Sequence, residues 1–389
     1  MGTNIPLGYE DTVATMRQAQ TEIISALNGA GITIQEYPSA LVPAKSSGIA
    51  AAVAYPIQGI LKYHGLSDWD WRVSFMPSIS VNNDSAHTLT LVEFDPGLTR
   101  DQVVIGGQHA EGRDYERVVR SLEVIRSVAG VSSRARVISK NILRAAKTGK
   151  GLGTSAGASA ALAAAALTAL LGETGIENTR FLSCMARLLA GSGCRSATGG
   201  VSLWLSYPGA AHEDSFSVRL DLRDQLQDIR LLTVPIDSRT GLKTETAHRD
   251  APHSAFFKAW MQSRKAEVLE CLEAVQAGDW RVLGQLAELD SLRLHGVTMS
   301  GSRENKVFAW EPENIPLFRM CNHLRQQGIP VYFSTDTGPT TVFITHREYA
   351  ATVLEEIKRQ ELGLEVVEGK LAGPVRLVGL DHAKEVLGM

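Results

Sequence analysis

Hydrophobic and polar residues follow two different spacings along the first half of the chain. Apolar residues recur three and four positions apart in the stretches predicted to be helices: 13–27, 113–130, 156–171 and 177–190. Continuously apolar or alternating runs predict strands: 48–55, 78–81, 88–92, 134–139 and 201–205. The first half is therefore predicted to mix helices with strands.

A second group of elements is predicted from about residue 228 onward. The strand patterns are 231–235, 331–334, 341–344 and 375–378. The helical patterns are 254–276, 279–290 and 347–361. We therefore expect an α+β protein with an N-terminal extension over 1–45, a first domain over 46–228 and a second domain over 229–389, which ends with the strand near 375. The helix in the extension could pack on the body or on a second subunit.

Length, net charge and cysteine content limit the kinds of protein that this chain could be. A chain of 389 residues has the length of two ordinary domains. The formal net charge of −3 gives no reason to expect a nucleic-acid or membrane partner. The four cysteines lack metal-type spacing and fit a reducing cytoplasm. We expect no signal peptide, and the run over 156–171 is expected to be too short and too weakly apolar to span a bilayer.

A loop rich in glycine and small hydroxyl residues, over 148–153, opens the alanine-rich helix. Glycines allow a tight turn, and the first turn of a helix offers unpaired N–H groups to an anion. Thr154 and Ser155 add hydroxyls that can bind phosphate oxygens or a metal ion held by phosphates. The loop is therefore predicted to bind phosphate, and the alternative is a tightly packed turn before a buried helix.

Two familiar phosphate loops do not fit this stretch. A Walker loop requires Ser or Thr after Gly-Lys, whereas Lys150 is followed by Gly151. A dinucleotide-binding loop requires an acidic residue about 20 residues later at the end of a second strand. Glu173 has that spacing but follows the helix directly.

Three charged residues stand at positions where chemistry is plausible, and each has a structural alternative. Lys62 follows an apolar run, and burying its charge there would be unfavourable unless the ammonium contacts an anion. Alternatively, Lys62 could mark the solvent end of a strand. Arg195 lies with Ser192 on a glycine-rich turn, suited to a carboxylate or phosphate, but it could also cap a helix end. Asp336 lies between two apolar strands in what could be an ordinary turn.

Taken together, these motifs resemble one family. Gly151 to Ala156 resembles the Gly-Leu-Ser-Ser-Ser-Ala phosphate loop of the GHMP kinase superfamily. Other segments match, in the same order, motifs of the ATP-dependent mevalonate diphosphate decarboxylases, a branch of that superfamily: 54–65, 78–81, 190–200, 290–297 and 335–339. The resemblance covers about residues 50–345, and the shared order is more specific than any single motif.

The resemblance implies a GHMP kinase fold with ATP and Mg²⁺ as cofactors. The N-terminal domain would resemble the second domain of ribosomal protein S5, the C-terminal domain would be ferredoxin-like, and the protein would be a homodimer. The nucleotide phosphates would be bound by Gly151, Gly153, Thr154, Ser155 and Ala156, with Ser155 also on the metal. The substrate would be bound by Tyr63, Ser80, Ser192 and Arg195.

The resemblance also implies a reaction, in which ATP phosphorylates a tertiary 3-hydroxyl. Phosphate then departs, and the neighbouring carboxylate is lost as carbon dioxide. Asp336 would accept the proton of the hydroxyl, Arg195 would hold the carboxylate, and Lys62 would stabilise the phosphoryl group. These roles are electrostatic positioning, which phosphoryl transfer requires.

The chain departs from the family where the family binds a diphosphate. Leu66 replaces a lysine, Ala190 replaces a serine, and His64 replaces a tryptophan. The loss of a cation and a hydroxyl predicts a substrate with a single phosphate, mevalonate 5-phosphate, which would give isopentenyl phosphate. Lys243 or Arg249 could supply a phosphate contact from the second domain.

Four alternatives remain open from the sequence. The chain could be the diphosphate decarboxylase itself, with Lys243 or Arg249 restoring the lost charge. It could act on mevalonate 3,5-bisphosphate without ATP, although the phosphate loop argues against this. It could be a kinase that phosphorylates mevalonate and stops. A non-catalytic ligand sensor should have lost Asp336 or Lys62, and this chain keeps both.

Overall fold

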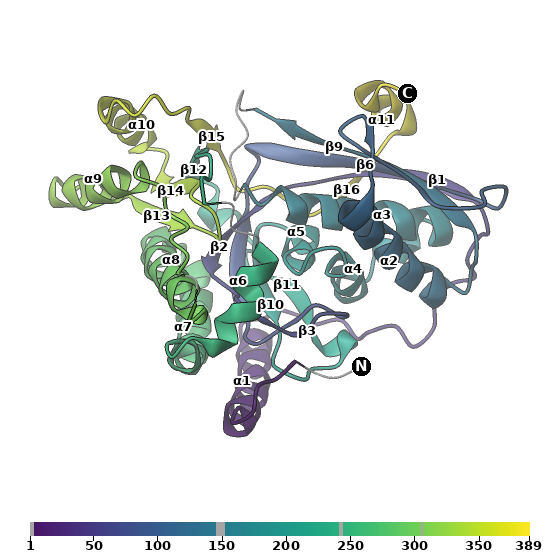
Figure 1. Ribbon diagram of the computed structural model, residues 1–389, viewed down its shortest axis with the longest axis horizontal. Coiled ribbons are helices and arrows are strands. Elements are labelled where there is room, and N and C mark those ends of the chain that lie inside the picture. Colours follow the sequence, from purple (N-terminus) through teal and green to yellow (C-terminus); the bar gives the residue numbers. More distant parts are fainter. Residues whose placement is uncertain (1–3, 145–151, 241–243, 305) are drawn as a thin grey trace.

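The computed structural model describes residues 4–144, 152–240, 244–304 and 306–389, and Figure 1 shows three main sheets with helices between and around them. The largest sheet has six strands in the order β16-β1-β6-β9-β7-β8. In chain order these are β1 (Gly48–Ala54), β6 (Ala86–Asp95), β7 (Gln102–Ile105), β8 (Gln108–His109), β9 (Arg134–Leu143) and β16 (Arg376–Val378).

Strand alternation gives this sheet two apolar faces. Ala50 and Ala52 of β1 pack against the buried helix α3 (Thr154–Leu171), while Ala51 and Val53 pack on the opposite side near α11 (Leu380–Leu387). The α3 side also carries α2 (Gly112–Ala129), α4 (Thr179–Ala186) and the short α5 (Gly193–Thr198).

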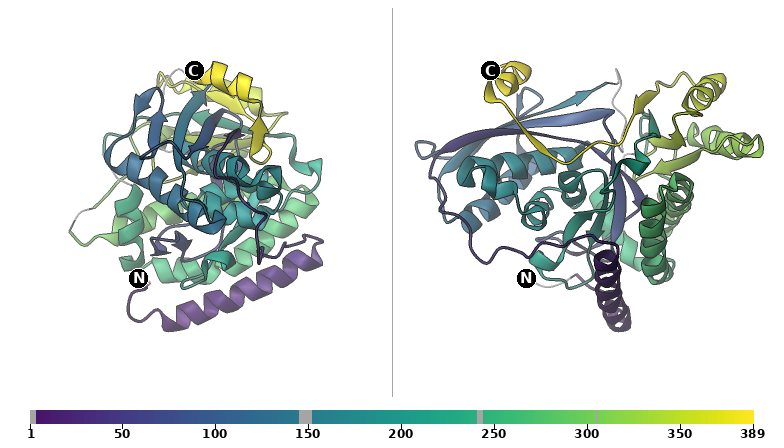
Figure 2. Two further views of the ribbon diagram at one scale, coloured as in Figure 1. Left: turned by 90° about the vertical axis from the view of Figure 1, so that its right-hand side faces the viewer. Right: turned by 180° about the vertical axis from the view of Figure 1, so that it is seen from behind.

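The second sheet has four strands in the order β11-β10-β5-β2. These are β2 (Ile57–Leu61), β5 (Ser78–Asn82), β10 (Val201–Leu205) and β11 (Phe216–Arg219). Its apolar residues form one cluster with α1 (Glu10–Gly29), α7 (Phe257–Ala277) and α8 (Trp280–Gly301). The N-terminal helix therefore packs on the body of its own chain, and Figure 2 shows it lying along one edge of the molecule.

The third sheet is antiparallel, in the order β13-β14-β12-β15. Its strands are β12 (Ile229–Val234), β13 (Tyr332–Thr335), β14 (Thr341–His346) and β15 (Val367–Gly369). The helices α9 (Asn314–Gln326) and α10 (Ala350–Arg359) cover one face, and α7 and α8 fill the space between the other face and the second sheet. A small ribbon of β3 (Leu66–Asp68) and β4 (Val73–Ser74), together with α6 (Thr244–Asp250), lies beside this junction.

The structure corrects several expectations about the elements. The last strand forms where predicted, but it pairs with β1 (Ala51 opposite Val378), so the end of the chain returns to the first sheet. The helix predicted over 279–290 continues to Gly301, and α6, α9 and α11 were not predicted. The α3 helix is, contrary to expectation, long and apolar enough to cross a membrane, but 78% of it is buried inside the protein, as in a core helix.

Candidate active site

A cavity of about 570 Å³ lies where the end of β2, the first turns of α3 and α5, and the turn after β13 meet. It brings together most of the residues that the sequence singled out: Lys62, Tyr63, Gly153, Thr154, Ser155, Ser192, Arg195 and Asp336. These residues come from four separate segments of the chain. Their convergence on one cavity makes it the candidate active site.

Lys62 is a buried cation and does not mark the solvent end of a strand, because its side chain is only 2% exposed. Its Nζ donates hydrogen bonds to Asp336 Oδ1 at 2.9 Å, Ser334 Oγ at 2.6 Å and the Gly59 carbonyl at 2.7 Å. Burial lowers the pKa of Lys62, and the Asp336 carboxylate opposes that shift. A cation and a carboxylate are thus held in contact at the wall of the cavity.

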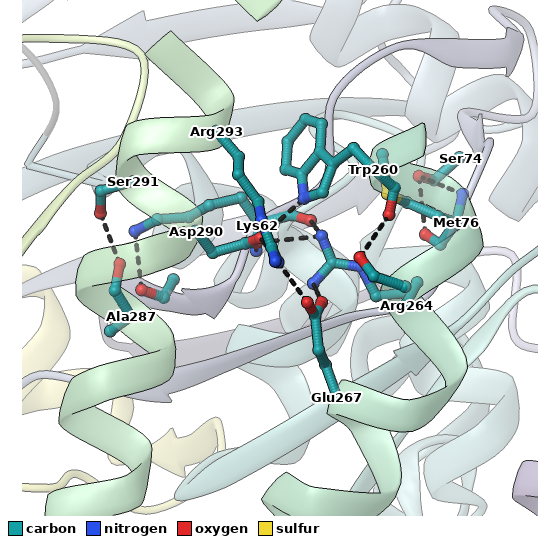
Figure 3. A network of polar contacts seen from close by, with 12 residues as sticks. Lys62, Ser74, Met76, Trp260, Arg264, Glu267, Ala287, Asp290, Ser291 and Arg293 are labelled. Atoms are coloured by element: carbon teal, nitrogen blue, oxygen red, sulfur yellow. Dashed lines mark hydrogen bonds and ion pairs between the residues drawn. The ribbon is translucent and has the colours of Figure 1, made fainter. Parts of the chain in front are cut away.

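Asp290 fixes the backbone of Lys62 through a hydrogen bond, as Figure 3 shows. The backbone N–H of Lys62 donates to Asp290 Oδ2 at 2.5 Å, and Arg264 Nη2 donates to the same oxygen at 2.9 Å and to the Lys62 carbonyl at 3.1 Å. Trp260 Nε1 donates to Asp290 Oδ1 at 2.6 Å. Because Asp290 and Arg264 are completely buried, this ion pair holds the end of β2 against α7 and α8.

Asp336 lies in the turn after β13, lines the cavity, and has a side chain that is 23% exposed. Thr335 anchors that turn: its backbone N–H donates to Ser291 Oγ at 3.0 Å, and its Oγ1 lies 3.1 Å from His295 Nε2. Trp310 Nε1 also donates to Thr335 Oγ1 at 3.3 Å. Burial lowers the pKa of His295 to about 3, so this ring is neutral near pH 7.

Arg195 lies in α5 as a buried guanidinium with unused donors. Its Nε and Nη1 atoms are buried and have no hydrogen-bond partner in the described part of the chain. The guanidinium carbon lies 5.4 Å from the Tyr63 ring centre and 6.0 Å from that of Trp204. Burial lowers the pKa of Arg195. An anion entering the cavity would satisfy these donors.

The first turn of α3 fits a bound nucleotide phosphate. Gly153 has a φ of 67°, and a Cβ there would lie 2.4 Å from the Ile57 carbonyl oxygen, so the loop can approach β2 only with glycine. Gly153, Thr154 and Ser155 line the cavity, and Ala156 is buried behind them. The predicted contact Gly151 lies outside the described residues. The first turn of this 18-residue helix thus offers backbone donors and two hydroxyls to an anion.

Two other predicted contacts, Ser80 and Arg249, do not line the cavity. Ser80 is buried in β5, and its hydroxyl has no hydrogen-bond partner among the described residues. Arg249 pairs with Glu245 at 3.3 Å and lies over the Trp69 ring at 5.3 Å, outside the lining. Lys243 lies outside the described residues.

The sequence reasoning missed three arginines in the lining: Arg72, Arg113 and Arg117. Arg113 and Arg117 are four positions apart at the start of α2, so they share one helix face, a spacing that could have drawn attention to them. Arg72 comes from the turn between β3 and β4 and has no such signal. Leu66 and Ala190, two of the three departures from the family pattern, line the same cavity, whereas His64 does not.

Comparison with known proteins agrees with this geometry. The sequence model of the diphosphomevalonate decarboxylase-like N-terminal domain matches residues 54–217. The phosphomevalonate decarboxylase of Haloferax volcanii is 35% identical over 336 residues, which cover 86% of this chain and 99% of that enzyme. This chain belongs to the diphosphomevalonate decarboxylase-like family. The prediction of a decarboxylase family of the mevalonate pathway is confirmed.

The structure of this chain is also similar to solved structures of mevalonate diphosphate decarboxylases. Mevalonate diphosphate decarboxylase from Staphylococcus aureus has a TM-score of 0.78 and 25% identity, covering 86% of this chain and 98% of that chain. The enzyme MDDEF in complex with MVAPP, AMPPCP and magnesium has a TM-score of 0.77 and 24% identity, covering 85% and 99%. The mixed helix and sheet architecture is therefore that of the GHMP-kinase-like mevalonate decarboxylases.

Proposed function

We propose that this protein decarboxylates mevalonate 5-phosphate to isopentenyl phosphate, with conversion of ATP to ADP and release of phosphate and carbon dioxide. The observation that carries the proposal is the cavity itself. It combines the ion pair of Lys62 and Asp336, the unpaired guanidinium of Arg195 and a helix N-terminus suited to phosphate. The phosphomevalonate decarboxylase of Haloferax volcanii supports the choice of substrate.

Asp336 and Lys62 would act on the tertiary 3-hydroxyl of the substrate. The Asp336 carboxylate accepts the hydroxyl proton as the oxygen takes up the phosphoryl group. Lys62, held 2.9 Å from Asp336, places a positive charge beside that oxygen, and the charge then stabilises the departing phosphate. Because Ser334 and the Gly59 carbonyl hold the ammonium in place, this charge needs no reorganisation during the reaction.

Arg195 would bind the C1 carboxylate and orient it for loss. When the C3–O bond breaks, phosphate leaves with the bonding electrons and C3 becomes positive. The C1–C2 bond then breaks, its electrons form the C2–C3 double bond, and carbon dioxide is released. A buried guanidinium that binds carboxylate through two donors fixes the position of that group until the bond breaks. Tyr63 and Ser192 contribute the neighbouring wall.

We propose ATP and Mg²⁺ as the co-substrate and metal, in line with the complex of MDDEF with AMPPCP and magnesium. Gly153, Thr154 and Ser155 would hold the phosphates, with Ser155 also contacting the metal. Within the described chain, no group of three or more histidine, cysteine, aspartate or glutamate side chains could hold a metal by itself. A magnesium ion carried by phosphates and a hydroxyl agrees with this.

The choice of a single substrate phosphate rests on Leu66 and Ala190, which face the cavity where the family resemblance places a lysine and a serine. We further propose that residues 46–228 and 229–389 form S5-like and ferredoxin-like domains, apart from the terminal strand β16. The protein would act in the cytoplasm as a homodimer.

Product stoichiometry tests the proposed reaction. Purified protein, ATP, Mg²⁺ and mevalonate 5-phosphate should give ADP, phosphate, carbon dioxide and isopentenyl phosphate in equal amounts. ADP without carbon dioxide would identify a kinase. Carbon dioxide from mevalonate 3,5-bisphosphate without ATP, and none from mevalonate 5-phosphate with it, would contradict the proposal.

A further inference from the structure

The turn between β3 and β4 brings an arginine to the cavity in a conformation that arginine rarely adopts. Arg72 has a φ of 54°, in the left-handed region where a Cβ crowds the backbone. Among the described residues, Glu361 is the other non-glycine residue with positive φ. Strained backbone of this kind persists where the surrounding structure enforces it, and it is concentrated at binding sites.

The guanidinium groups of Arg72 and Arg117 are anchored side by side. Arg72 Nε donates to the Leu188 carbonyl at 3.3 Å, and Arg117 Nη2 donates to the Leu189 carbonyl at 2.5 Å. These carbonyls belong to consecutive residues directly before Ala190. The other N–H groups of Arg72 have no hydrogen-bond partner in the described part of the chain, and Arg72 lines the cavity.

The charges at this end of the cavity match one phosphate. Arg113 lies 2.5 Å from Glu245, which also pairs with Arg249 at 3.3 Å, so one carboxylate serves these two exposed arginines. Arg72 and Arg117 remain as two partly buried cations, and burial lowers the pKa of both. Two neighbouring, partly buried cations repel each other unless an anion lies between them. A phosphate monoester, with a charge of about −1.5 to −2 at pH 7, balances two arginines.

The neighbouring wall completes a phosphate site. Leu66 stands where the family resemblance places a lysine, so that position carries no charge here. Arg72, six residues further along the chain, brings a positive charge to the same cavity. The Trp69 Nε1 atom is buried without a hydrogen-bond partner in the described chain, and Trp69 also lines the cavity. The site therefore offers an additional N–H donor beside the two guanidinium groups.

We propose that Arg72 determines substrate specificity by binding the 5-phosphate of the substrate together with Arg117. This inference rests on the proposed function. The charge that selects the substrate has moved from position 66 to position 72, and two unpaired arginines match a monophosphate better than a diphosphate, which carries about one further negative charge.

The test compares Arg72→Gln with a control arginine, Arg120 of α2, that contacts the same turn. Loss of a charge-assisted contact should raise the KM for mevalonate 5-phosphate by about 10- to 100-fold while kcat changes less than about threefold. Arg120→Gln is the control, because Arg120 is half exposed and pairs with Asp70 of the same turn without lining the cavity. It should leave both parameters unchanged, and Arg72→Lys should recover part of the loss.

A second variant separates binding from structure. Arg72→Gly removes the side chain but suits the left-handed backbone, so its unfolding temperature should equal or exceed that of the wild type while its KM rises as in Arg72→Gln. An unchanged KM in both variants would overturn the role of Arg72 and leave the proposed function intact. A wild type that releases no carbon dioxide from any mevalonate phosphate would overturn both.

Discussion

Lys62 Nζ and Asp336 Oδ1 lie 2.9 Å apart across the junction of the second and third sheets, although 274 residues separate them in sequence. The lysine is buried and the aspartate faces the cavity. Asp290 and Arg264 hold the end of β2, which carries Lys62, against α7 and α8. Assembly of the reacting groups therefore depends on the packing between the two halves of the chain.

Removing the carboxylate of Asp336 tests its role as the proton acceptor. Asp336→Asn keeps the shape and can still contact Lys62, but it is a far weaker base. We expect kcat to fall by about 10³-fold, with the KM for ATP little changed and the unfolding temperature preserved. Steady-state ADP and carbon dioxide release measure this. A variant retaining more than about a tenth of wild-type kcat would argue against general-base chemistry at this position.

Position 59 has room only for glycine, because the ion pair of Lys62 and Asp336 lies directly beside it. A Cβ at this position would lie 2.7 Å from Lys62 Cδ and 2.9 Å from Asp336 Oδ1. Gly59→Ala should therefore displace the pair and lower kcat by about 10²-fold, since misplacement of reacting groups by about 1 Å has effects of that size. Gly296→Ala is the matched control, because nothing lies within 4 Å of its Cβ position. Equal activity of the two variants would contradict this account.

Breaking the buried ion pair under Lys62 should destabilise the whole protein. Asp290→Ala leaves the Arg264 guanidinium buried without its carboxylate and frees the Lys62 backbone N–H. We expect a loss of about 3–5 kcal/mol in the free energy of unfolding, measured by urea denaturation. The surface pair of Arg359, which is 71% exposed, and Glu356, which is 19% exposed, provides the comparison, because Glu356→Ala should cost less than about 1 kcal/mol. Similar losses in the two variants would show that burial does not matter here.

Buried histidines should make the fold sensitive to acid. Burial lowers the pKa of His212 and His295 to about 3 and that of His248 to about 4. Below about pH 6.5, the ordinary histidine pKa, these three histidines are protonated in the unfolded chain but stay neutral in the folded chain. The free energy of unfolding therefore falls as the pH decreases from about 6.5 toward 4. Each such histidine contributes up to about 1.4 kcal/mol per pH unit in that window.

Urea unfolding at pH 7, 6 and 5 measures this dependence. His295→Asn, which removes one of these groups, should reduce the slope of unfolding free energy against pH by up to about 1.4 kcal/mol per unit. A stability that is constant between pH 5 and 7 would contradict the assignment of neutral buried rings.

Local sequence motifs were sufficient to find Lys62, Arg195 and Asp336, because each belongs to a short contiguous segment with a characteristic composition. They could not reveal Arg72 or Arg117, since nothing local shows that the turn after β3 and the start of α2 meet at one cavity. Both arginines are positioned by main-chain carbonyls of residues 188 and 189, which any sequence would supply.

The sequence also predicted individual strands and helices better than their pairing and their ends. Alternating apolar residues identified the strand at 376–378 but not its neighbour, because pairing with β1 is a long-range choice that side-chain period does not encode. The helix α8 was predicted too short because Gly296 and Thr298 weaken the helical signal beyond residue 290, whereas packing of Leu294 and Val297 in the core carries it to Gly301.

The measurement that tests the central claim most directly is carbon dioxide release with mevalonate 5-phosphate and mevalonate 5-diphosphate in parallel, at saturating ATP and Mg²⁺. Charge matching at Arg72 and Arg117, with Leu66 and Ala190 in the wall, predicts a kcat/KM at least about 100-fold higher for the monophosphate. An equal or higher kcat/KM for the diphosphate would contradict the account.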